Sequence, residues 1–369
     1  MELVFWLGFA GVAYSYFGYP LVLLVWGRLR PREVERDPGY LPRVSVVLPV
    51  HNEEKNLPGR LSNLQALDYP PERLEIFVVS DASTDATTEI VRKFQANDPR
   101  IHLIELEDRG GKAGGLNAGV AAAGGEVIVF TDAGIEVEPE SLRALVAPLA
   151  DSEVGCVSAE DRVEGGGGEA LYGRYELFLR DRESRVASVV GASGSYYAQR
   201  RDLVPRFPDG IAPDFLSVLY AVDQGYRAIS EPRARGRMGA VRSPSGEFRR
   251  KVRTLLRGMT GLVAYRHLLN PFRTGAFAFI LASHKLARWL VPGFLVVMLV
   301  ANVALAADPF YGLLLVLHVG FYLAGLGALA GAPGLRRLLA ARIPAYFINV
   351  NAAIAVAWWR YLRGERMEV

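Results

Sequence analysis

Acidic residues stand at the ends of short apolar runs, and this pattern constrains the fold more than any other feature of the chain. Asp81 closes the run IFVVSD, and Asp132 closes the run VIVFTD. Such runs are typical of buried strands in a parallel sheet, and open α/β sheets bind ligands at the carboxyl ends of their strands. We therefore expect both acids to line one cleft, where a metal–diphosphate group would compensate their charge.

Strands and helices are expected to alternate in the first half of the chain. The sequence predicts strands at VSVVLPV, LEIFVVS, IHLIEL and EVIVFTD, and helices that begin near Glu53, Thr84 and Lys112. Repeated strand–helix units of this kind form a parallel sheet with right-handed crossovers. A further strand is predicted at EVGCVSA, and the glycine-rich segment 164–169 predicts a flexible loop, with a substrate gate as the alternative.

Long apolar segments near both ends predict membrane helices. Segment 1–27 carries no charge from Leu3 to Trp26, which is enough to cross about 30 Å of hydrocarbon as a helix. It lacks the positive leader and the cleavage site of a signal peptide. Arginines follow at positions 28, 30 and 32, so the positive-inside rule places the next part of the chain in the cytoplasm.

The C-terminal third combines basic and apolar segments. Residues 243–288 carry cations at helical spacing and are predicted to form amphipathic helices on an anionic membrane surface. His284 and Lys285 are expected to contact a lipid phosphate or to anchor the interface. Residues 289–360 hold the C-terminal transmembrane segments; the last, IPAYFINVNAAIAVAWW, has basic flanks and is expected to span, to lie at the interface or to re-enter.

Several function classes are disfavoured by what the sequence lacks. PVHNEE follows the first predicted strand, so the dinucleotide-binding glycine fingerprint is missing, and GKAGGLNAG lacks the spacing of an ATPase phosphate loop. A net charge of +3 indicates no nucleic-acid partner. The single cysteine, Cys156, rules out an internal disulfide and fits a reducing compartment.

Seven segments resemble, in order, the motifs of the family 2 glycosyltransferases. They are VSVVLPVHNEE, VVSDASTD, GGKAGGLNAG, VIVFTDAG, GASGSYYAQR, APDFLSVLYAVDQGYRA and EFRRKVRTLLRG. The resemblance runs from about Arg43 to Arg257, and the flanking membrane helices with SHKLARWL are similar to the membrane-anchored bacterial branch. It implies an α/β fold of the GT-A type, a Rossmann-like and mostly parallel cytosolic domain over residues 42–240, with transmembrane helices at both ends.

The resemblance also implies a donor site. Asp81 would accept a hydrogen bond from the nucleobase, usually uracil, because a carboxylate is a good acceptor for an imide N–H. Pro49 and Glu53 would surround the base and ribose, and Lys112 would bind the diphosphate as a point charge. The simpler alternatives are a first-turn helix residue for Glu53 and a solvated loop residue for Lys112.

A metal site is implied at Asp132, which matches the first acid of the family's D-x-D motif. It would hold Mg²⁺ or Mn²⁺ against the diphosphate and so offset the charge of the departing nucleotide. The third position of the motif is Gly134, so water or another carboxylate would complete the coordination. A helix N-cap is the simpler role for Asp132.

On the acceptor side, Asp214 matches the family's general base, which removes the proton of the attacking hydroxyl. Pro213 stands where another acid is usual, and a helix cap is the simpler role for Asp214. Gly194 and Ser195 would shape the acceptor cleft. Arg253 best matches the arginine of the Q-x-x-R-W motif and would clamp the diphosphate or bind a head group. The absent tryptophan argues against a polymer-threading synthase.

The leading interpretation is an inverting hexosyl- or N-acetylhexosaminyltransferase of the bacterial inner membrane, with its catalytic domain in the cytoplasm. It would use a nucleotide-diphospho-sugar, with UDP expected, and a lipid-linked or polysaccharide acceptor in cell-surface or exopolysaccharide synthesis. Partners would include membrane lipids and a polysaccharide assembly system. Two alternatives stay open: a polyprenyl-phosphate sugar transferase, and a non-catalytic membrane subunit that binds nucleotide without turnover.

Overall fold

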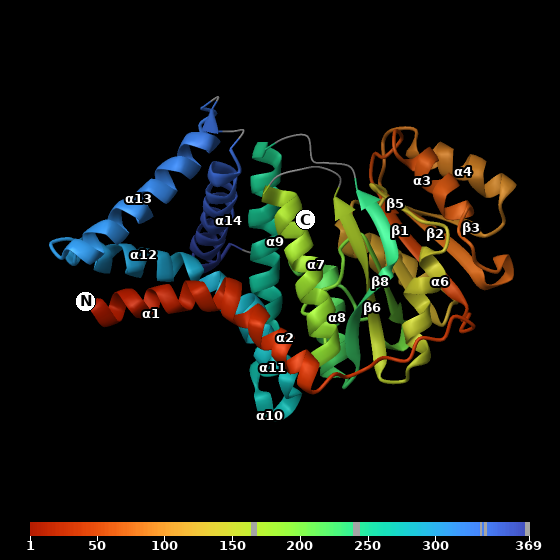
Figure 1. Ribbon diagram of the computed structural model, residues 1–369. Coiled ribbons are helices and arrows are strands. Elements are labelled where there is room, and N and C mark those ends of the chain that lie inside the picture. Colours follow the sequence, from red (N-terminus) through yellow and green to blue (C-terminus); the bar gives the residue numbers. More distant parts are fainter. Residues whose placement is uncertain (164–167, 239–243, 333, 336–337, 366–369) are drawn as a thin grey trace.

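The strands and the long apolar helices occupy opposite sides of the molecule. The computed structural model describes residues 1–163, 168–238, 244–332, 334–335 and 338–365, so most of the predicted glycine-rich loop or gate lies outside the described residues. Figure 1 shows the strands on one side and the long helices from both ends of the sequence on the other. Helices α7 (Gly168–Val186) and α9 (Pro244–Ala264) lie between them.

Within the described residues, eight strands form a mixed sheet in the order β3-β2-β1-β4-β7-β6-β8-β5. Their bounds are β1 Val44–Val50, β2 Leu74–Asp81, β3 Ile101–Leu106, β4 Val127–Thr131, β5 Ile135–Val137, β6 Val154–Val163, β7 Tyr196–Arg200 and β8 Arg227–Met238. β3, β2, β1 and β4 are parallel, as the strand–helix alternation predicts. β7 runs antiparallel to β4 and β6, and β5 antiparallel to β8, so the second half of the sheet is mixed.

Helices cover both faces of this sheet. Val47 packs into one core and its neighbours Val46 and Leu48 into the other, because successive strand residues point to opposite faces. Helix α5 packs on β1 and β2, where a Cβ on Gly115 would lie 2.9 Å from Pro49 Cβ. The α-helices of this part are α3 Leu57–Gln65, α4 Thr87–Asn97, α5 Gly111–Ala122, α6 Ser141–Val146 and α8 Pro213–Asp223, with short 3₁₀ turns at Pro71–Arg73, Ala147–Ala150 and Arg201–Leu203.

Four helical segments of the described residues are long and apolar enough to cross a membrane: Glu2–Leu29, Ala276–Ala304, Pro309–Leu329 and Ala340–Leu362. The first comprises α1 (Glu2–Ala13), the π-helical turn η1 (Tyr14–Gly18) and α2 (Tyr19–Leu29). The second comprises α11 (Ala276–Leu281), the π-helical turn η6 (Ala282–Ala287) and α12 (Arg288–Ala304). The others are α13 (Pro309–Leu329) and α14 (Leu339–Leu362), and the short η5 (Arg266–Leu269) and α10 (Pro271–Thr274) follow α9.

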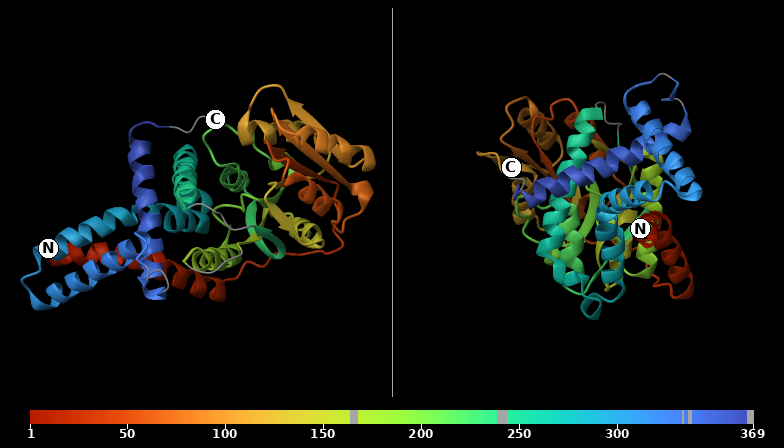
Figure 2. Two further views of the ribbon diagram at one scale, coloured as in Figure 1. Left: turned by 90° about the horizontal axis from the view of Figure 1, so that it is seen from above. Right: turned by 90° about the vertical axis from the view of Figure 1, so that its left-hand side faces the viewer.

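The last apolar helix differs in direction from the others. In Figure 1 and in the left view of Figure 2, α14 runs across the direction of α1 and α12 rather than along it. It packs against α9 and α13, while α1 packs against α12. A helix that lies across its neighbours and against the basic helix α9 fits the interfacial option that the sequence left open for this segment.

Candidate active site

A cleft of about 350 Å³ lies at the carboxyl ends of β1, β2 and β4. Its lining includes five residues predicted from the sequence, together with His51 and Arg109, which were not predicted. The five are Pro49, Glu53, Asp81, Lys112 and Asp132. The parallel half of the sheet thus brings the ends of three strands together, as expected of ligand sites in open α/β sheets.

The loops after β1 and β2 hold each other in place at the base of this cleft. Asn52 and Ala82 have positive φ angles of 54° and 49°. Such a conformation costs free energy in a residue with a Cβ and persists only where contacts enforce it. Here Asn52 Oδ1 accepts the N–H of Thr84 at 2.8 Å, and His51 Nδ1 lies 2.6 Å from the carbonyl oxygen of Asp81. These contacts fix the position of Asp81.

Glu53 lies in the turn before helix α3. That helix begins at Leu57, so the alternative of a first-turn helix residue is wrong. The Glu53 carboxylate accepts from Asn56 Nδ2 at 2.8 Å, and its backbone N–H donates to Thr87 Oγ1 at 2.8 Å. Glu53 is therefore placed at the wall of the cleft by contacts with both neighbouring helices.

The start of helix α5 joins Asp81 to the cleft. Asp81 is buried, and its Oδ1 accepts the N–H of Gly110, the N-cap of α5, at 2.7 Å. Gly111, with φ of 63°, and Lys112 form the first turn and line the cleft. The free N–H groups and the positive dipole end of a helix N-terminus attract phosphate, so this end of α5 provides an anion site beside a carboxylate.

Lys112 bridges the two sides of the cleft. Its Nζ donates to Asp132 Oδ1 at 2.6 Å and to the carbonyl oxygen of Gly194 at 3.0 Å. The side chains of Lys112 and Asp132 are 38% and 37% exposed, so a ligand can reach both. The solvated-loop role for Lys112 is therefore wrong. The N-cap role for Asp132 is also wrong, because the strand β5 follows it at Ile135.

Gly194 lies next to Asp214 on the far side of Lys112. A Cβ on Gly194 would lie 3.6 Å from Asp214 Oδ2, which is van der Waals contact, so Gly194 is a direct neighbour of the carboxylate. Asp214 is in the first turn of α8, whose N-cap is Ala212 and has no side-chain cap. The helix-cap role for Asp214 is therefore wrong, and the carboxylate faces the strip where Lys112 binds.

The backbone of Ser195 is hydrogen-bonded to the residues at the end of β4. Its carbonyl oxygen accepts from the Thr131 hydroxyl at 3.0 Å and from the Asp132 N–H at 3.2 Å, and its own hydroxyl points to Met238 Sδ at 3.2 Å. Ser195 is buried. The structure therefore gives its backbone a role in holding the end of β4, and its contact with an acceptor stays a prediction.

The sequence missed Arg257, which lies one helical turn after the predicted Arg253. Arg253 is exposed on α9, whereas Arg257 is part-buried, and its Nε has no partner among the described residues. Burial and the nearby Arg253 lower the pKa of Arg257, while the carboxylates of Asp209 and Asp214 raise it. The four-residue spacing along one helix face was the signal that could have found it.

Asp161, at the end of β6, was also missed. Its carboxylate accepts a hydrogen bond from the Ser193 hydroxyl, and its Oδ1 is buried without a partner among the described residues. Burial raises the pKa of Asp161 to about 6, the Ser193 hydrogen bond and Arg180 oppose that shift, and Asp132 adds to it. The signal was present, because the apolar run EVGCVSA ends in an acidic pair as the runs before Asp81 and Asp132 end in an acid.

The donor groups of the cleft fit a cation that arrives with a diphosphate. Across the described ranges, no three His, Cys, Asp or Glu side chains are grouped so as to hold a metal ion. Asp132 offers an accessible carboxylate. Mg²⁺ is often bound by one or two carboxylates, substrate phosphates and water, so Asp132 suits such a site better than a preformed cage.

Comparisons with known proteins agree with this geometry. The model of glycosyl transferase family 2 matches residues 45–204. The probable glycosyltransferase YdaM of Bacillus subtilis is 38% identical over 127 residues, which are 33% of this chain and 30% of that protein. The beta-monoglucosyldiacylglycerol synthase of a Nostoc species is 29% identical over 137 residues, which are 36% of this chain and 29% of that protein. The chain thus spans about a third of the length of these relatives.

A solved structure is similar along nearly the whole chain. It is the mannosyltransferase PcManGT from Pyrobaculum calidifontis in complex with GDP-Man and Mn²⁺, with a TM-score of 0.75 and 27% identity. The match covers 98% of this chain and 100% of that one. The predicted family 2 glycosyltransferase domain is confirmed over residues 45–204, where the family model matches, and the predicted GT-A fold class is confirmed by the structural likeness.

Proposed function

We propose that the protein is an inverting glycosyltransferase that moves a sugar from a nucleotide-diphospho-sugar to a lipid-linked acceptor at a membrane. The observation that carries the proposal is a continuous series of contacts from Asp81 to Asp214. Asp81 accepts from Gly110, the N-cap of α5, and Lys112 of α5 binds both Asp132 and the carbonyl oxygen of Gly194. Gly194 in turn lies against the Asp214 carboxylate. The nucleotide side and the base side of the reaction are therefore adjacent.

The diphosphate is proposed to lie between the start of α5 and Asp132. Lys112 places a positive charge there, and the N–H groups of the first turn of α5 add a second source of positive potential. A divalent cation at Asp132 would offset the charge on the departing diphosphate. Asp81 would hold the base through its carboxylate, which the Gly110 N–H orients.

Asp214 is proposed to act as the general base. The acceptor hydroxyl oxygen forms a bond to the anomeric carbon while the bond from that carbon to the diphosphate oxygen breaks, and the electron pair leaves on the diphosphate. The proton of the hydroxyl passes to Asp214 as the new bond forms. Attack from the Asp214 side, opposite the leaving group, inverts the anomeric configuration.

The nucleobase of the donor has two candidates, uracil and guanine. Asp81 suits the imide N–H of uracil, which is the basis for expecting a UDP-sugar, but guanine also presents a ring N–H donor. The mannosyltransferase that matches the whole chain was solved with GDP-Man, and this favours a GDP-sugar as a second candidate. Both belong in the first donor panel.

We place the catalytic domain on the cytoplasmic side of the bacterial inner membrane. If α14 lies on the membrane surface, as its direction suggests, the segments Glu2–Leu29, Ala276–Ala304 and Pro309–Leu329 cross. All three arginine groups then fall on one side, as the positive-inside rule requires. Their members among the described residues are Arg28, Arg30 and Arg32; Arg342; and Arg360 and Arg363.

The test is nucleoside diphosphate release by the full-length protein in lipid nanodiscs. UDP-, GDP- and dTDP-sugars are each supplied with Mg²⁺, Mn²⁺ or chelator and a membrane lipid extract, and Asp132→Asn and Asp214→Asn serve as matched variants. We expect cation-dependent release with one nucleotide and loss of release in both variants. Binding of that nucleotide with no release under any condition would favour the non-catalytic alternative, and full activity in both variants would overturn the site.

A further inference from the structure

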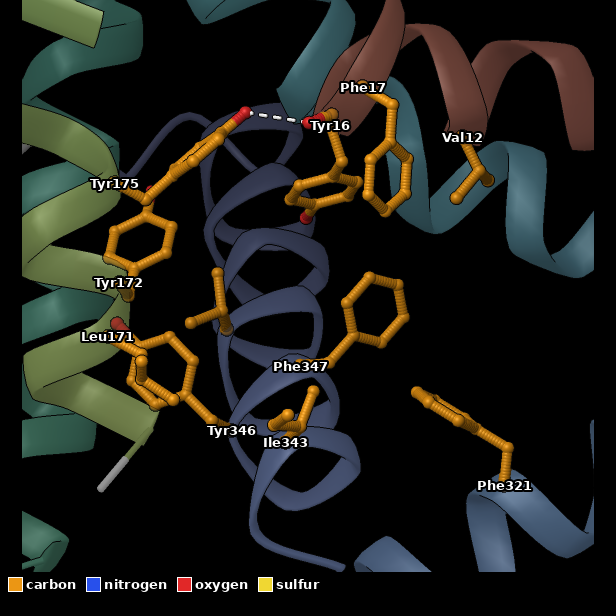
Figure 3. Close-up of a pocket in the computed structure, with 11 residues that line it drawn as sticks. Val12, Tyr16, Phe17, Leu171, Tyr172, Tyr175, Phe321, Ile343, Tyr346 and Phe347 are labelled. Carbon is orange, nitrogen blue, oxygen red and sulfur yellow. Dashed lines mark hydrogen bonds between the residues drawn. The ribbon is translucent and has the colours of Figure 1, made fainter. Parts of the chain in front are cut away.

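An aromatic cavity of about 490 Å³ lies between the apolar helices and α7. Figure 3 shows that its walls come from η1, α7, α13 and α14, chiefly through Tyr16, Tyr172, Tyr175, Tyr346 and Phe347. The Tyr175 hydroxyl donates to the carbonyl oxygen of Tyr16 at 3.0 Å and so ties α7 to the first membrane segment. The proposed transfer reaction makes no use of this cavity.

The setting of the cavity favours a hydrocarbon occupant. Its volume falls within the range of about 300–1,000 Å³ that is typical of small-molecule sites. Phe17 and Ile343 line it and are 77% and 48% exposed, so the mouth is apolar. Phe17 belongs to a segment that is long and apolar enough to cross a membrane, and Ile343 belongs to α14, which lies at the membrane surface in the proposed topology, so both can meet lipid. A chain of lipid can enter such a mouth, whereas water gains few hydrogen bonds there.

A buried cation, Arg288, lies next to the tyrosine rings that line the cavity. The guanidinium carbon of Arg288 lies 5.9, 5.8 and 5.1 Å from the ring centroids of Tyr16, Tyr172 and Tyr175. Arg288 is 6% exposed and is paired with Glu176, yet its Nε and Nη2 have no partner within the part of the chain that the structure describes. Buried donors without a partner are costly and call for an explanation, and an anionic ligand group would supply one.

Lys285 places a second cation beside Phe215, the residue that follows Asp214. It precedes Arg288 by three residues, which is less than one helical turn, and its Nζ lies 5.4 Å from the centre of the Phe215 ring, next to Asp214 in sequence. Among the described residues, no carboxylate lies within ion-pair distance of Lys285. His284, by contrast, is bound by Glu183 at 2.5 Å and Glu176 at 3.1 Å, so of the two residues predicted to meet a lipid phosphate only Lys285 is free to do so.

We infer that the aromatic cavity binds the hydrocarbon chain of a single-chain, phosphate-linked glycolipid acceptor, with its phosphate between Arg288 and Lys285 and the attacking hydroxyl of its sugar at Asp214. One cavity accommodates one chain, which favours a prenyl-type phosphate over a two-chain phospholipid. The inference rests on the proposed function, because it names the lipid of that acceptor. It explains why a tyrosine of α7, Tyr175, joins the domain that carries the active site to the first of the long apolar segments.

The inference is tested by photo-labelling in phosphatidylcholine nanodiscs. The probe is a diazirine-bearing prenyl phosphate, compared with diazirine-bearing phosphatidylglycerol and with a diazirine-bearing alkane that has no phosphate. Labelled peptides are identified by mass spectrometry. We expect the prenyl phosphate to label peptides that contain residues 12–17, 171–175 and 343–350, and unlabelled prenyl phosphate to compete. Equal labelling by phosphatidylglycerol or by the alkane would overturn the inference and assign the cavity to bulk lipid.

A second set of labelling experiments uses variants in which larger side chains fill the cavity. Val350→Phe and Ile343→Trp add volume at the wall and at the mouth, while Leu317→Trp adds it to an exposed position of α13 outside the lining. Labelling is expected to fall at least about tenfold in the first two and to be unchanged in the third. Labelling that persists in both filled variants would overturn the inference. Donor binding is measured on the same proteins. If the proposed function fails, the wild type does not bind the donor; if only the lipid inference fails, donor binding is retained.

Lys285→Gln tests the phosphate end. We expect the KM for a prenyl-phosphate-linked sugar acceptor to rise about tenfold, as loss of a charge-assisted contact implies, while nucleotide affinity and the melting temperature stay close to those of the wild type. A lower kcat with an unchanged KM, or an equal effect on a phosphate-free acceptor, would contradict a phosphate contact. The alkane probe should label Lys285→Gln as well as it labels the wild type.

Discussion

The molecule holds two groups of charges that differ in exposure. In the donor cleft, Lys112 and Asp132 form a pair in which each side chain is more than a third exposed. At the junction with the membrane helices, Glu176, Glu183, His284 and Arg288 form what we call the junction cluster, in which His284 and Glu183 are 4% and 0% exposed. An exposed pair contributes little to stability and exchanges partners readily. A buried one is costly to break.

The difference separates two tasks. In the proposed reaction Lys112 would have to release Asp132 or share it when a charged donor enters, so a weak, accessible pair suits that role. The junction cluster connects α7 to η6 and α12, and Tyr19 of the first membrane segment donates to Glu183 at 2.5 Å. It thereby fixes the domain that carries the sheet relative to the long apolar helices. We expect changes in the cleft to affect turnover, and changes in the cluster to affect stability first.

The largest effect is expected from Asp214→Asn. Loss of a general base typically lowers kcat about 10²–10⁴-fold, while donor affinity, which depends on other residues, stays the same. Asp223→Asn is the matched control, because it changes the same residue type at the opposite end of α8. Steady-state release of nucleoside diphosphate and equilibrium nucleotide binding measure the two quantities. An equal loss in both variants would mean that Asp214 acts only through the helix.

Next in size is the effect of Glu176→Gln on stability. Burial opposes ionisation of Glu176, but Arg288 and His284 hold its pKa well below the usual value. Stability from this ionised carboxylate is therefore present at neutral pH and is lost as the pH falls through its folded-state pKa. Removing the charge leaves Arg288 unpaired, which we expect to cost about 3–5 kcal/mol in the free energy of unfolding.

An exposed ion pair serves as the control for the Glu176→Gln variant. Arg92 and Glu105 are joined at 2.7 Å, and their side chains are 59% and 49% exposed. Arg92→Gln should change the free energy of unfolding by less than about 1 kcal/mol. Denaturant unfolding in the same detergent measures both variants. If Glu176→Gln were as mild as Arg92→Gln, the junction cluster would not be the stabilising connection that we describe.

The contribution of Asp161 to stability should depend on pH in the opposite direction to that of Glu176. Its pKa of about 6 in the folded protein is above the unfolded value of about 3.9, so ionisation favours the unfolded chain. Stability from this group is full below pH about 4 and falls by at most about 3 kcal/mol as the pH rises to about 6. The difference in unfolding free energy between Asp161→Asn and the wild type should therefore grow in favour of the variant over that range. A difference independent of pH would show that the carboxylate does not titrate there.

The sequence predicted the cleft well because topology alone brings its residues together. Asp81 and Asp132 end parallel strands of one sheet, so they must meet at one edge whatever the side chains around them do. Asp161 follows the same rule, but β6 continues through it to Val163, and the apolar pattern was taken to end at Ala159. The simpler helix roles fail because α3 begins at Leu57 rather than near Glu53, because strand β5 follows Asp132, and because the N-cap of α8 is Ala212 rather than Asp214.

The junction cluster and the aromatic cavity had no comparable signal. His284 meets Glu183 and Glu176 across 101 and 108 residues of sequence, and neither spacing nor composition encodes such a contact. The last helix is also longer than its apolar run, because it begins at Leu339 and carries Pro344 in its first turns. Pairings between distant helices are decided by packing, which the pattern of one segment does not contain.

The smallest expected effect separates two arginines on one helix. The sequence assigned the diphosphate clamp to Arg253, whereas in the structure Arg253 is exposed and the part-buried Arg257 interacts electrostatically with Asp214. Because a charge next to the base acts at short range and an exposed charge is screened, Arg257→Gln should lower kcat about tenfold and Arg253→Gln less than about twofold. Steady-state kinetics at low and high salt tests both. If Arg253→Gln had the larger effect and also weakened nucleotide binding, α9 would have to close over the cleft during turnover, and the role predicted from the sequence would hold in that closed state.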